Sequence, residues 1–243
     1  MNAVLIVQAR MTSTRLPGKV LKTVLGKSLL EYQIERLKRV SNVCDIVIAT
    51  TDKVTDDPIV DLCKRLNVSV FRGSEDDVLS RYYHAAKAHD ADLVVRVTSD
   101  CPLIDPAVID EVIETIVKKY PKVDYVSNCL QRTFPRGMDT EVFTMDALRF
   151  AFEYARVPAE REHVTPYIYN NQKQFACENV TYDSNESRHR WTVDTLEDLD
   201  LIKVILESLY PVNKEFTLRD ILNFMNKNPK LFSINAHVEQ KHV

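Results

Sequence analysis

Residues 3–19 read AVLIVQARMTSTRLPGK and join an apolar run to a cationic loop. The run 3–7 carries no polar residue, which is typical of a strand buried on both faces of a parallel sheet. The loop after it carries Arg10, Arg15 and Lys19. In open α/β sheets, ligands bind at the carboxyl ends of the strands. We therefore expect the three cations to line a ligand site at the end of the first strand.

The chemistry of this loop indicates a polyanion such as a nucleoside triphosphate. Guanidinium groups bind phosphate oxygens in pairs, and lysine adds a compact positive charge. Pro17 and Gly18 stiffen the chain directly before Lys19 and would help to aim it. The glycine patterns of the GxxxxGK[ST] and GxGxxG phosphate loops are absent. A solvated basic loop therefore stays open as the alternative.

Strand and helix patterns alternate up to residue 127, which predicts an α/β fold with a doubly wound, mostly parallel, Rossmann-like sheet. The expected strands are 3–7, 45–50, 68–71, 92–98 and 124–127, and the expected helices are 29–40, 57–66, 78–89 and 106–120. Asp57-Pro58 and Asp105-Pro106 each indicate an N-cap followed by a first-turn proline. A short strand at 191–194 and helices at 195–209 and 217–226, each opened by a capping-box pattern, complete the prediction.

The alternation breaks around residues 128–185, which indicates an inserted subdomain with a loop at 131–139, strands at 140–144 and 176–182 and a helix at 145–155. Phe143, Leu148, Phe152 and Tyr154 give it apolar surface that a small excursion from the sheet could not bury alone. This surface predicts a homodimer. We expect a single domain at 1–227, including the insertion, and a C-terminal tail at 228–243.

The composition argues against some classes of function. The 243 residues are 45% hydrophobic and 28% charged, which is ordinary for a globular protein. A net charge of −3 argues against a nucleic-acid binder held by bulk electrostatics. No apolar run of about 18 residues and no signal-peptide pattern is present, so we expect no membrane partner. The five cysteines form no CxxC pair, which suits reduced thiols in the cytoplasm.

Several motifs together resemble one enzyme family. QARMTSTRLPGKVL, at 8–21, resembles the signature loop of the sugar-activating cytidylyltransferases, the group containing the KDO and acylneuraminate cytidylyltransferases. The resemblance is closest to the branch of the spore coat polysaccharide biosynthesis protein SpsF. It continues in the family's order through GSEDDVLSRYYHAA (73–86), RVTSDCPLIDP (96–106), FPRGMDTEVF (134–143), REHVTPYIY (161–169) and RWTVDTLEDL (190–199).

The resemblance implies a nucleotide-diphospho-sugar transferase type of fold. It also implies an enzyme that uses CTP to make a CMP-sugar and releases pyrophosphate. By this comparison the triphosphate would contact Arg10, Arg15 and Lys19 with help from Ser13, and Gln8 and Ala9 would lie near the base. Arg10, Lys19 and Asp100 would be catalytic. Asp77 would lie on the nucleotide side of the site and Arg81 on the sugar side. An equally good interpretation is that these two residues, one helical turn apart, form an exposed charge pair without a role in binding.

Two carboxylates fit a magnesium ion, which nucleotidyl transfer commonly uses to neutralise phosphate charge. Asp100 follows the strand 92–98, and Asp194 follows the strand 191–193 just ahead of a helix. Considered alone, Asp100 reads as a turn residue and Asp194 as a helix cap. The resemblance places both at the family's metal-binding aspartates, with VDTLEDL matching the family's VDTPEDL.

The sugar pocket is expected from the inserted region and the segment after it. Its candidates are Arg136, Asp139, Glu141, Glu162, His163, Arg188 and Arg190. Arginines could hold the carboxylate or phosphate of an acidic substrate, and ion pairing among these charges is the competing interpretation.

The leading function is a CTP-dependent, Mg²⁺-dependent enzyme of surface polysaccharide biosynthesis. The alternatives are another nucleoside triphosphate, a phosphorylated or phosphonate acceptor, a glycosyltransferase of related fold, and a nucleotide-binding scaffold without activity. A glycosyltransferase would need a DxD motif at a strand end. Asp198-Leu199-Asp200 has that spelling but falls in an expected helix.

Overall fold

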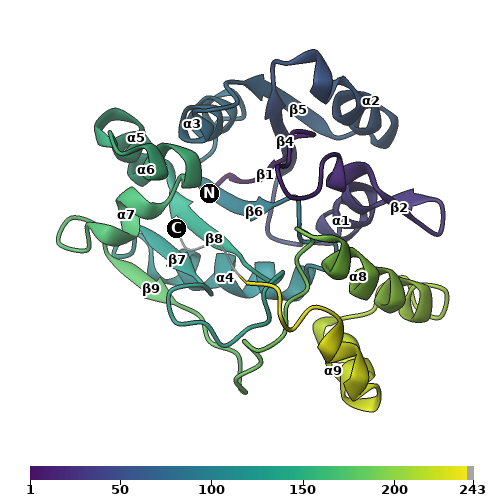
Figure 1. The fold of residues 1–243 in the computed structure, drawn as a ribbon. Coiled ribbons are helices and arrows are strands. Elements are labelled where there is room, and N and C mark those ends of the chain that lie inside the picture. Colours follow the sequence, from purple (N-terminus) through teal and green to yellow (C-terminus); the bar gives the residue numbers. More distant parts are fainter. Residues whose placement is uncertain (240–243) are drawn as a thin grey trace.

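The computed structural model describes residues 1–239 of the chain, and Figure 1 shows a central sheet with helices around it. The sheet has seven strands in the order β5-β4-β1-β6-β8-β7-β9 in this part of the chain. Their bounds are β1 Ala3–Gln8, β4 Asp45–Thr51, β5 Ser69–Gly73, β6 Leu93–Thr98, β7 Tyr125–Ser127, β8 Glu141–Thr144 and β9 Cys177–Asn179. A separate hairpin pairs β2 (Thr23–Val24) with β3 (Lys27–Ser28).

Seven of the helices in the described residues match the expected ranges closely, and the short helices α6 and α7 were not predicted. Their bounds are α1 Leu29–Leu37, α2 Asp57–Leu66, α3 Val78–Ala88, α4 Pro106–Lys119, α5 Met145–Tyr154, α6 Pro158–His163, α7 Pro166–Asn170, α8 Leu196–Leu209 and α9 Leu218–Lys227. Short 3-10 helices lie at Lys19–Leu21, Val54–Asp56 and Pro229–Ile234. Among residues 1–239, no helix combines the length and the apolar character that crossing a membrane requires.

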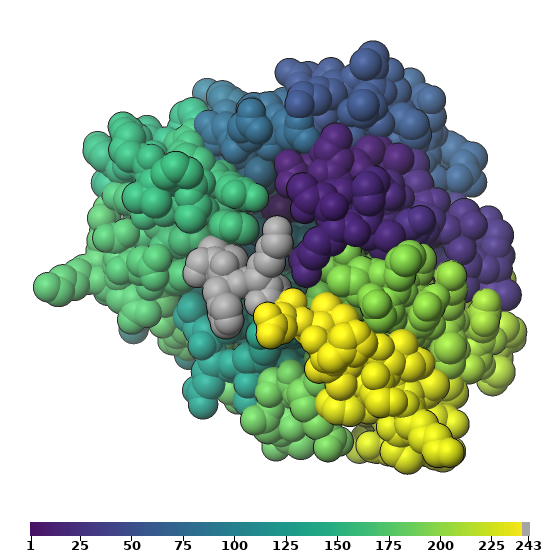
Figure 2. All heavy atoms as spheres, viewed as in Figure 1, coloured from purple at the N-terminus to yellow at the C-terminus, as the bar shows by residue number. Residues whose placement is uncertain are grey.

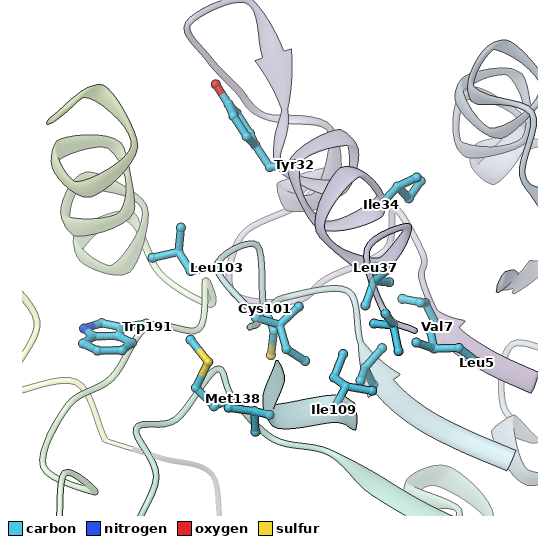
Figure 3. Packing of buried hydrophobic residues seen from close by; sticks show 14 of the residues in the cluster. Leu5, Val7, Tyr32, Ile34, Leu37, Cys101, Leu103, Ile109, Met138 and Trp191 are labelled. Carbon is cyan, nitrogen blue, oxygen red and sulfur yellow. The ribbon is translucent and has the colours of Figure 1, made fainter. Parts of the chain in front are cut away.

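β1 lies in the middle of the sheet, parallel to β4 on one side and to β6 on the other. Its side chains alternate between two apolar clusters: Leu5 and Val7 belong to one, and Val4 and Ile6 to the other. Figure 3 shows Leu5 and Val7 near Leu37 of α1 and Ile109 of α4. The unbroken apolar run thus arises because both faces of this strand are covered, and the predicted doubly wound, mostly parallel sheet is confirmed.

Helix starts are where the sequence prediction is most accurate. Asp105 caps α4 by accepting a hydrogen bond from the Ala107 amide. Thr195 and Thr217 open α8 and α9 with the predicted capping boxes. The start of α2 differs by one position, because Asp56 occupies the N-cap and Asp57 is already helical.

The region 128–185 is built into the main sheet, which corrects the expected excursion from it. β8 is inserted between β6 and β7 and runs antiparallel to both, and β9 adds a parallel edge strand beside β7. Phe143 and Leu148 have no exposed surface within the monomer. The prediction that these two residues form an apolar outer surface was therefore wrong. Tyr154 is 53% exposed, and Phe152 is half-buried against Tyr83.

Two smaller expectations also differ from the structure. Residues 191–194 form no strand, and the neighbouring segment makes only an isolated bridge between Arg136 and Arg190. The described part of the expected tail contains the 3-10 helix Pro229–Ile234, and Asn235 after it is buried. Residues 240–243 of the expected tail lie outside the described residues.

The topology brings several loops to one edge of the sheet, and four of them carry most of the predicted site residues. β1, β6, β7 and β9 all run in the same direction, so the segments 9–19, 99–105, 128–140 and 180–195 leave at their carboxyl ends. β8 runs the other way, and its first residue pairs with the ends of β6 and β7. In Figure 2 the purple N-terminal chain meets the green chain that contains α8 on the face shown.

Gly137 shows how tightly two of these loops meet. Its φ is +103°, and a Cβ atom there would lie 2.8 Å from the carbonyl carbon and oxygen of Trp191. The backbone hydrogen bonds from Arg136 N to His189 O and from Trp191 N to Arg136 O hold the loops at this spacing. Only glycine fits without separating them.

We predict that Gly137→Ala lowers the free energy of unfolding by about 2–3 kcal/mol, because backbone strain and a clash with main-chain atoms add together. Gly26→Ala is the matched control, since Gly26 also has a positive φ, of 79°, but meets no atom within 4 Å. It should show only the backbone strain, about 1 kcal/mol. Equal losses in urea unfolding of the two variants would contradict the close contact at Trp191.

Candidate active site

Lys19 is the centre of the candidate site. Its ammonium lies 2.8 Å from Asp194 Oδ1 and 3.5 Å from Asp100 Oδ2. Lys19 comes from the loop after β1, Asp100 from the loop after β6 and Asp194 from the segment ahead of α8. The structure thus brings together three of the residues that the sequence singled out, at the predicted edge of the sheet.

Asp194 also binds two arginines through its second oxygen. Arg15 lies 2.9 Å and Arg190 2.8 Å from Asp194 Oδ2. Arg190 in turn contacts Asp198, which has no exposed surface. Three cations therefore converge on one largely buried carboxylate, and Asp198 supplies a further negative charge behind it.

The charges in this cluster stabilise one another. Burial lowers the pKa of Lys19, but Asp100 and Asp194 outweigh burial and raise this pKa above its ordinary value. Burial raises the pKa of Asp100, but the Lys19 charge and a hydrogen bond from Thr98 outweigh it, and the net pKa is lowered. Lys19 and Asp100 are therefore both charged at neutral pH.

Asp56 anchors the start of the cationic loop. It has no exposed surface, and its Oδ1 accepts a 2.8 Å hydrogen bond from the Met11 amide. Its Oδ2 accepts hydrogen bonds from the hydroxyls of Thr50 (3.0 Å) and Thr51 (2.6 Å) at the end of β4. This buried carboxylate fixes the chain directly after Arg10.

Glu75 holds the same loop from the other side. It accepts a hydrogen bond from Thr12, pairs with Lys53, and lies 3.6 Å from Arg10. Ser13 takes part in the loop itself, because its hydroxyl accepts a 3.5 Å hydrogen bond from the Leu16 amide. The expected phosphate loop is therefore an ordered turn with its cations held near carboxylates.

Gln8 and Glu141 belong to a buried network centred on Arg96. Arg96 donates a 3.2 Å hydrogen bond to Gln8 Oε1 and forms an ion pair with Glu141. The other Glu141 oxygen accepts 2.6 Å hydrogen bonds from Tyr125 and Thr165. Glu141 is thus engaged structurally, whereas Gln8 and the buried Ala9 stand at the end of β1 beside the loop.

Asp77 and Arg81 do not form the exposed pair that was one interpretation. Asp77 caps α3 and pairs with Arg161 of α6. Arg81 is buried, and its guanidinium donates a 2.7 Å hydrogen bond to Ser74 O. Burial is the main cause that lowers the pKa of Arg81, and the charge of Arg10 lowers it further.

The remaining candidates differ in their exposure and in their partners. Asp139 forms a two-point pair with Arg132, and burial together with the nearby Arg132 charge lowers the pKa of Arg136. Arg188 is exposed. Glu162 is exposed on α6, and burial lowers the pKa of the neighbouring His163.

Asp100 and Asp194 have the chemistry that a magnesium ion requires. Both carboxylates face the same ammonium group, so their oxygens converge on one point where a positive charge is already held. Mg²⁺ typically takes one or two carboxylates and completes its shell with phosphate oxygens and water. No group of three or more acidic, histidine or cysteine side chains within residues 1–239 is placed to hold a metal, so an ion held by these two aspartates would take its other ligands from phosphate oxygens and water.

Sequence reasoning missed Asp56, Glu75, Asp198 and Arg132. The capping box singled out Asp198 as a helix-start residue but carried no sign that it would bind Arg190. The contacts of Asp56 and Glu75 join loops that are distant in the sequence, and Arg132 pairs with Asp139 across its own loop, so the spacing of these residues did not indicate their roles.

The cytidylyltransferase family profile matches residues 4–225. An uncharacterized protein of Methanocaldococcus jannaschii is 41% identical over 99% of this chain and 97% of its own length. The spore coat polysaccharide biosynthesis protein SpsF of Bacillus subtilis is 31% identical over 94% of this chain and 96% of its own length.

Solved structures agree with this grouping. A cytidylyltransferase from Leptospira borgpetersenii superposes with a TM-score of 0.92 at 35% identity and covers 100% of both chains. A CMP:2-keto-3-deoxy-manno-octonic acid synthetase, solved in complex with CTP, superposes with a TM-score of 0.66 at 16% identity over 85% of this chain and 99% of that one, which shows a shared fold. The match over most of the chain, together with the cluster around Lys19, shows that this protein belongs to the cytidylyltransferase family of nucleotidyltransferases.

Proposed function

We propose that this enzyme transfers the cytidylyl group of CTP to a sugar or sugar acid and releases pyrophosphate. The observation that carries the proposal is the position of Lys19 between Asp100 and Asp194 at the carboxyl edge of the sheet. Family membership supports cytidylyl transfer, and the structural neighbour bound to CTP supports the choice of nucleotide. The name of the Bacillus subtilis relative supports a role in surface polysaccharide biosynthesis.

In this proposal the triphosphate binds the cations of the first loop. Arg10 lies near Glu75, and Arg15 and Lys19 contact Asp194. The phosphate oxygens of a bound triphosphate would accept charge-assisted hydrogen bonds from the same cations, in competition with these carboxylates. Backbone atoms around Gln8 and Ala9, held at the end of β1, would contact the base.

The acceptor hydroxyl oxygen forms a new bond to the α-phosphorus of CTP. The bond from that phosphorus to the bridging oxygen breaks, pyrophosphate leaves with the electron pair, and the acceptor's hydroxyl proton is released. Arg10 and Lys19 stabilise the charge on the phosphates and hold the attack in line. When bound to Asp100 and Asp194, Mg²⁺ would neutralise further phosphate charge.

We place the acceptor among the loops 128–140 and 180–195. Arg136 has both Arg132 and Arg190 close enough to lower its pKa, after the larger effect of burial. An anionic group on the acceptor would pair with an arginine of these loops, which supports a sugar acid as the acceptor. Asp139 would lie beside that pocket, paired with Arg132. His163 and Glu162 would border it from α6, and Arg188 from the segment before Arg190.

The alternative functions would each require different residues at the site. Another nucleoside triphosphate or a phosphorylated or phosphonate acceptor would use the same cluster, so only substrate screening separates them. A glycosyltransferase would need its DxD motif at a strand end, whereas Asp198 and Asp200 lie in α8 and Asp198 is buried. A scaffold without activity would not need Lys19 and the two aspartates to converge.

We also propose a homodimer and a cytoplasmic location. Stacked ring pairs, Tyr83 with Phe152 and Phe150 with Tyr154, lie on α3 and α5. Tyr154 and Val157 beside them are each 53% exposed, which is unusual for large apolar side chains grouped together. All five cysteines are free thiols, which suits a reducing compartment.

Lys19→Ala should weaken CTP binding by roughly ten- to a hundredfold, because a charge-assisted hydrogen bond to phosphate contributes about 1.5–3 kcal/mol. Turnover should fall with it. Lys22→Ala, three residues further along, is the matched control and should bind and react as the wild type does. Calorimetric titration with CTP and pyrophosphate release measure the two effects. An unchanged affinity and rate in Lys19→Ala would remove the proposed phosphate role.

Asp100→Asn and Asp194→Asn should each lower kcat by about a hundredfold or more and should reduce nucleotide binding less, because several kcal/mol of charge stabilisation would be lost. Asp200→Asn changes an exposed carboxylate of α8 and serves as the control. EDTA should abolish turnover of the wild type, and excess Mg²⁺ should restore it. Activity that persists in EDTA, or a near-normal rate in Asp100→Asn, would make these carboxylates structural.

The homodimer is tested by light scattering at micromolar concentration. Val157→Glu should convert the dimer to a monomer, because it places a charge beside the aromatic pairs. Val212→Glu, at a position 85% exposed elsewhere on the molecule, should leave the dimer intact. A monomeric wild type would defeat this proposal.

A further inference from the structure

The described C-terminal segment packs behind the active site. After α9 the chain forms the 3-10 helix Pro229–Ile234, and Figure 1 shows this yellow segment running back past α8. Leu231 and Ile234 pack against the main apolar cluster. The Phe232 ring meets His189 edge-on with centroids 5.8 Å apart. This segment is therefore in contact with the residues that precede Asp194.

Asn235, directly after this helix, is the polar end of that contact. It is only 4% exposed. Its side-chain amide donates one 2.9 Å hydrogen bond to Arg190 O and another, also 2.9 Å, to Asp198 Oδ1. Because the Asn235 amide is buried and donates both hydrogen bonds to the Arg190–Asp198 pair, it fixes the geometry of that pair.

Asp198 in turn holds Asp194 through hydrogen bonds. Its Oδ2 accepts hydrogen bonds from the Asp194 amide at 2.9 Å and the Thr195 amide at 3.1 Å. Its Oδ1 accepts from Arg190 Nε at 2.9 Å, and the same guanidinium reaches Asp194 Oδ2 at 2.8 Å. Both the backbone and the carboxylate of Asp194 are thus tied to Asp198.

We propose that Asn235 is a positioning residue for the reaction, which holds the Asp194 carboxylate in place through Asp198 and Arg190. The inference rests on the proposed function, in which Asp194 acts beside Lys19 and Asp100. Without the Asn235 amide, Asp198 Oδ1 and Arg190 O each lose a donor in a buried site, and the Asp198 carboxylate is held less tightly against the Asp194 amide. A displaced catalytic carboxylate lowers the rate of the chemical step, whereas the loop cations still bind the triphosphate.

The first test compares Asn235→Ala with Asn228→Ala. Asn228 is the same residue type in the same segment, but it is exposed and its amide donates to Phe224 O at the end of α9. Asn235→Ala should lower kcat by roughly tenfold or more, with KM for CTP within about twofold of the wild type. Mn²⁺ binding in the presence of CTP, followed by electron paramagnetic resonance, should weaken severalfold. Asn228→Ala should match the wild type in all three measurements.

A second pair of variants separates positioning from simple loss of stability. Leu231→Ala loosens the packing of the same segment without touching Asp198, and it should lower the unfolding midpoint without changing kcat or Mn²⁺ binding below that midpoint. If it changes kcat and Mn²⁺ binding as much as Asn235→Ala does, the proposal is overturned. Asn235→Ser keeps a short donor and should recover part of kcat; it also replaces Asn235→Ala if that variant does not fold.

A double-mutant cycle gives the decisive result. In an Asp194→Asn background, adding Asn235→Ala should cause almost no further loss of kcat, since the group that it positions is already changed. Full additivity of the two losses would overturn the proposal. If neither the wild type nor Asn228→Ala releases pyrophosphate from CTP, the proposed function and this inference both fail. If both are active and Asn235→Ala equals them, only the positioning role fails.

Discussion

The architecture of the site depends on the carboxylate of Asp194, where Lys19, Arg15 and Arg190 meet. Three cations cannot share a partly buried space unless negative charge offsets their repulsion. Asp194 and Asp198 supply that charge from the start of α8, and Asp100 adds a further share from the loop after β6. The loop after β1 is thereby drawn across the edge of the sheet to a helix that is distant in the sequence. The same contacts keep its cations directed at one point.

Local chemistry explains which parts of the fold could be predicted. An apolar run identified β1, and N-caps and capping boxes located α4, α8 and α9, because these signals lie within a few neighbouring residues. The place of β8 could not be read in the same way. The sequence of the four buried residues 141–144 suits a strand of the main sheet and a strand of a separate unit equally well. Which of the two forms depends on pairing with β6 and β7, and the sequence does not show that pairing.

The same limit applies to the site. Lys19 was predicted because it lies on the cationic loop after β1, and Asp100 and Asp194 were predicted because their motifs resemble those of a known family; the structure brings all three together. Glu141 has an equally suggestive position, but its oxygens are occupied by Arg96, Tyr125 and Thr165. A sequence shows that an acidic side chain is present, but it does not show how many hydrogen-bond donors surround the carboxylate in the fold. Asp56 was overlooked for the opposite reason, since its partners are main-chain and hydroxyl groups that carry no charge pattern.

The antiparallel direction of β8 has a consequence for how such an enzyme can diversify. Because β7 ends and β8 begins at the same edge, the loop 128–140 leaves the sheet and returns to it at adjacent strands. Its length and composition can change without shifting the register of any strand, provided that Gly137 or an equivalent close approach to Trp191 is kept. The cationic loop after β1 belongs to a different connection and would be unaffected. If the acceptor binds at the loop 128–140, as we propose, exchange of this loop between relatives would change the acceptor while leaving the cationic loop as it is.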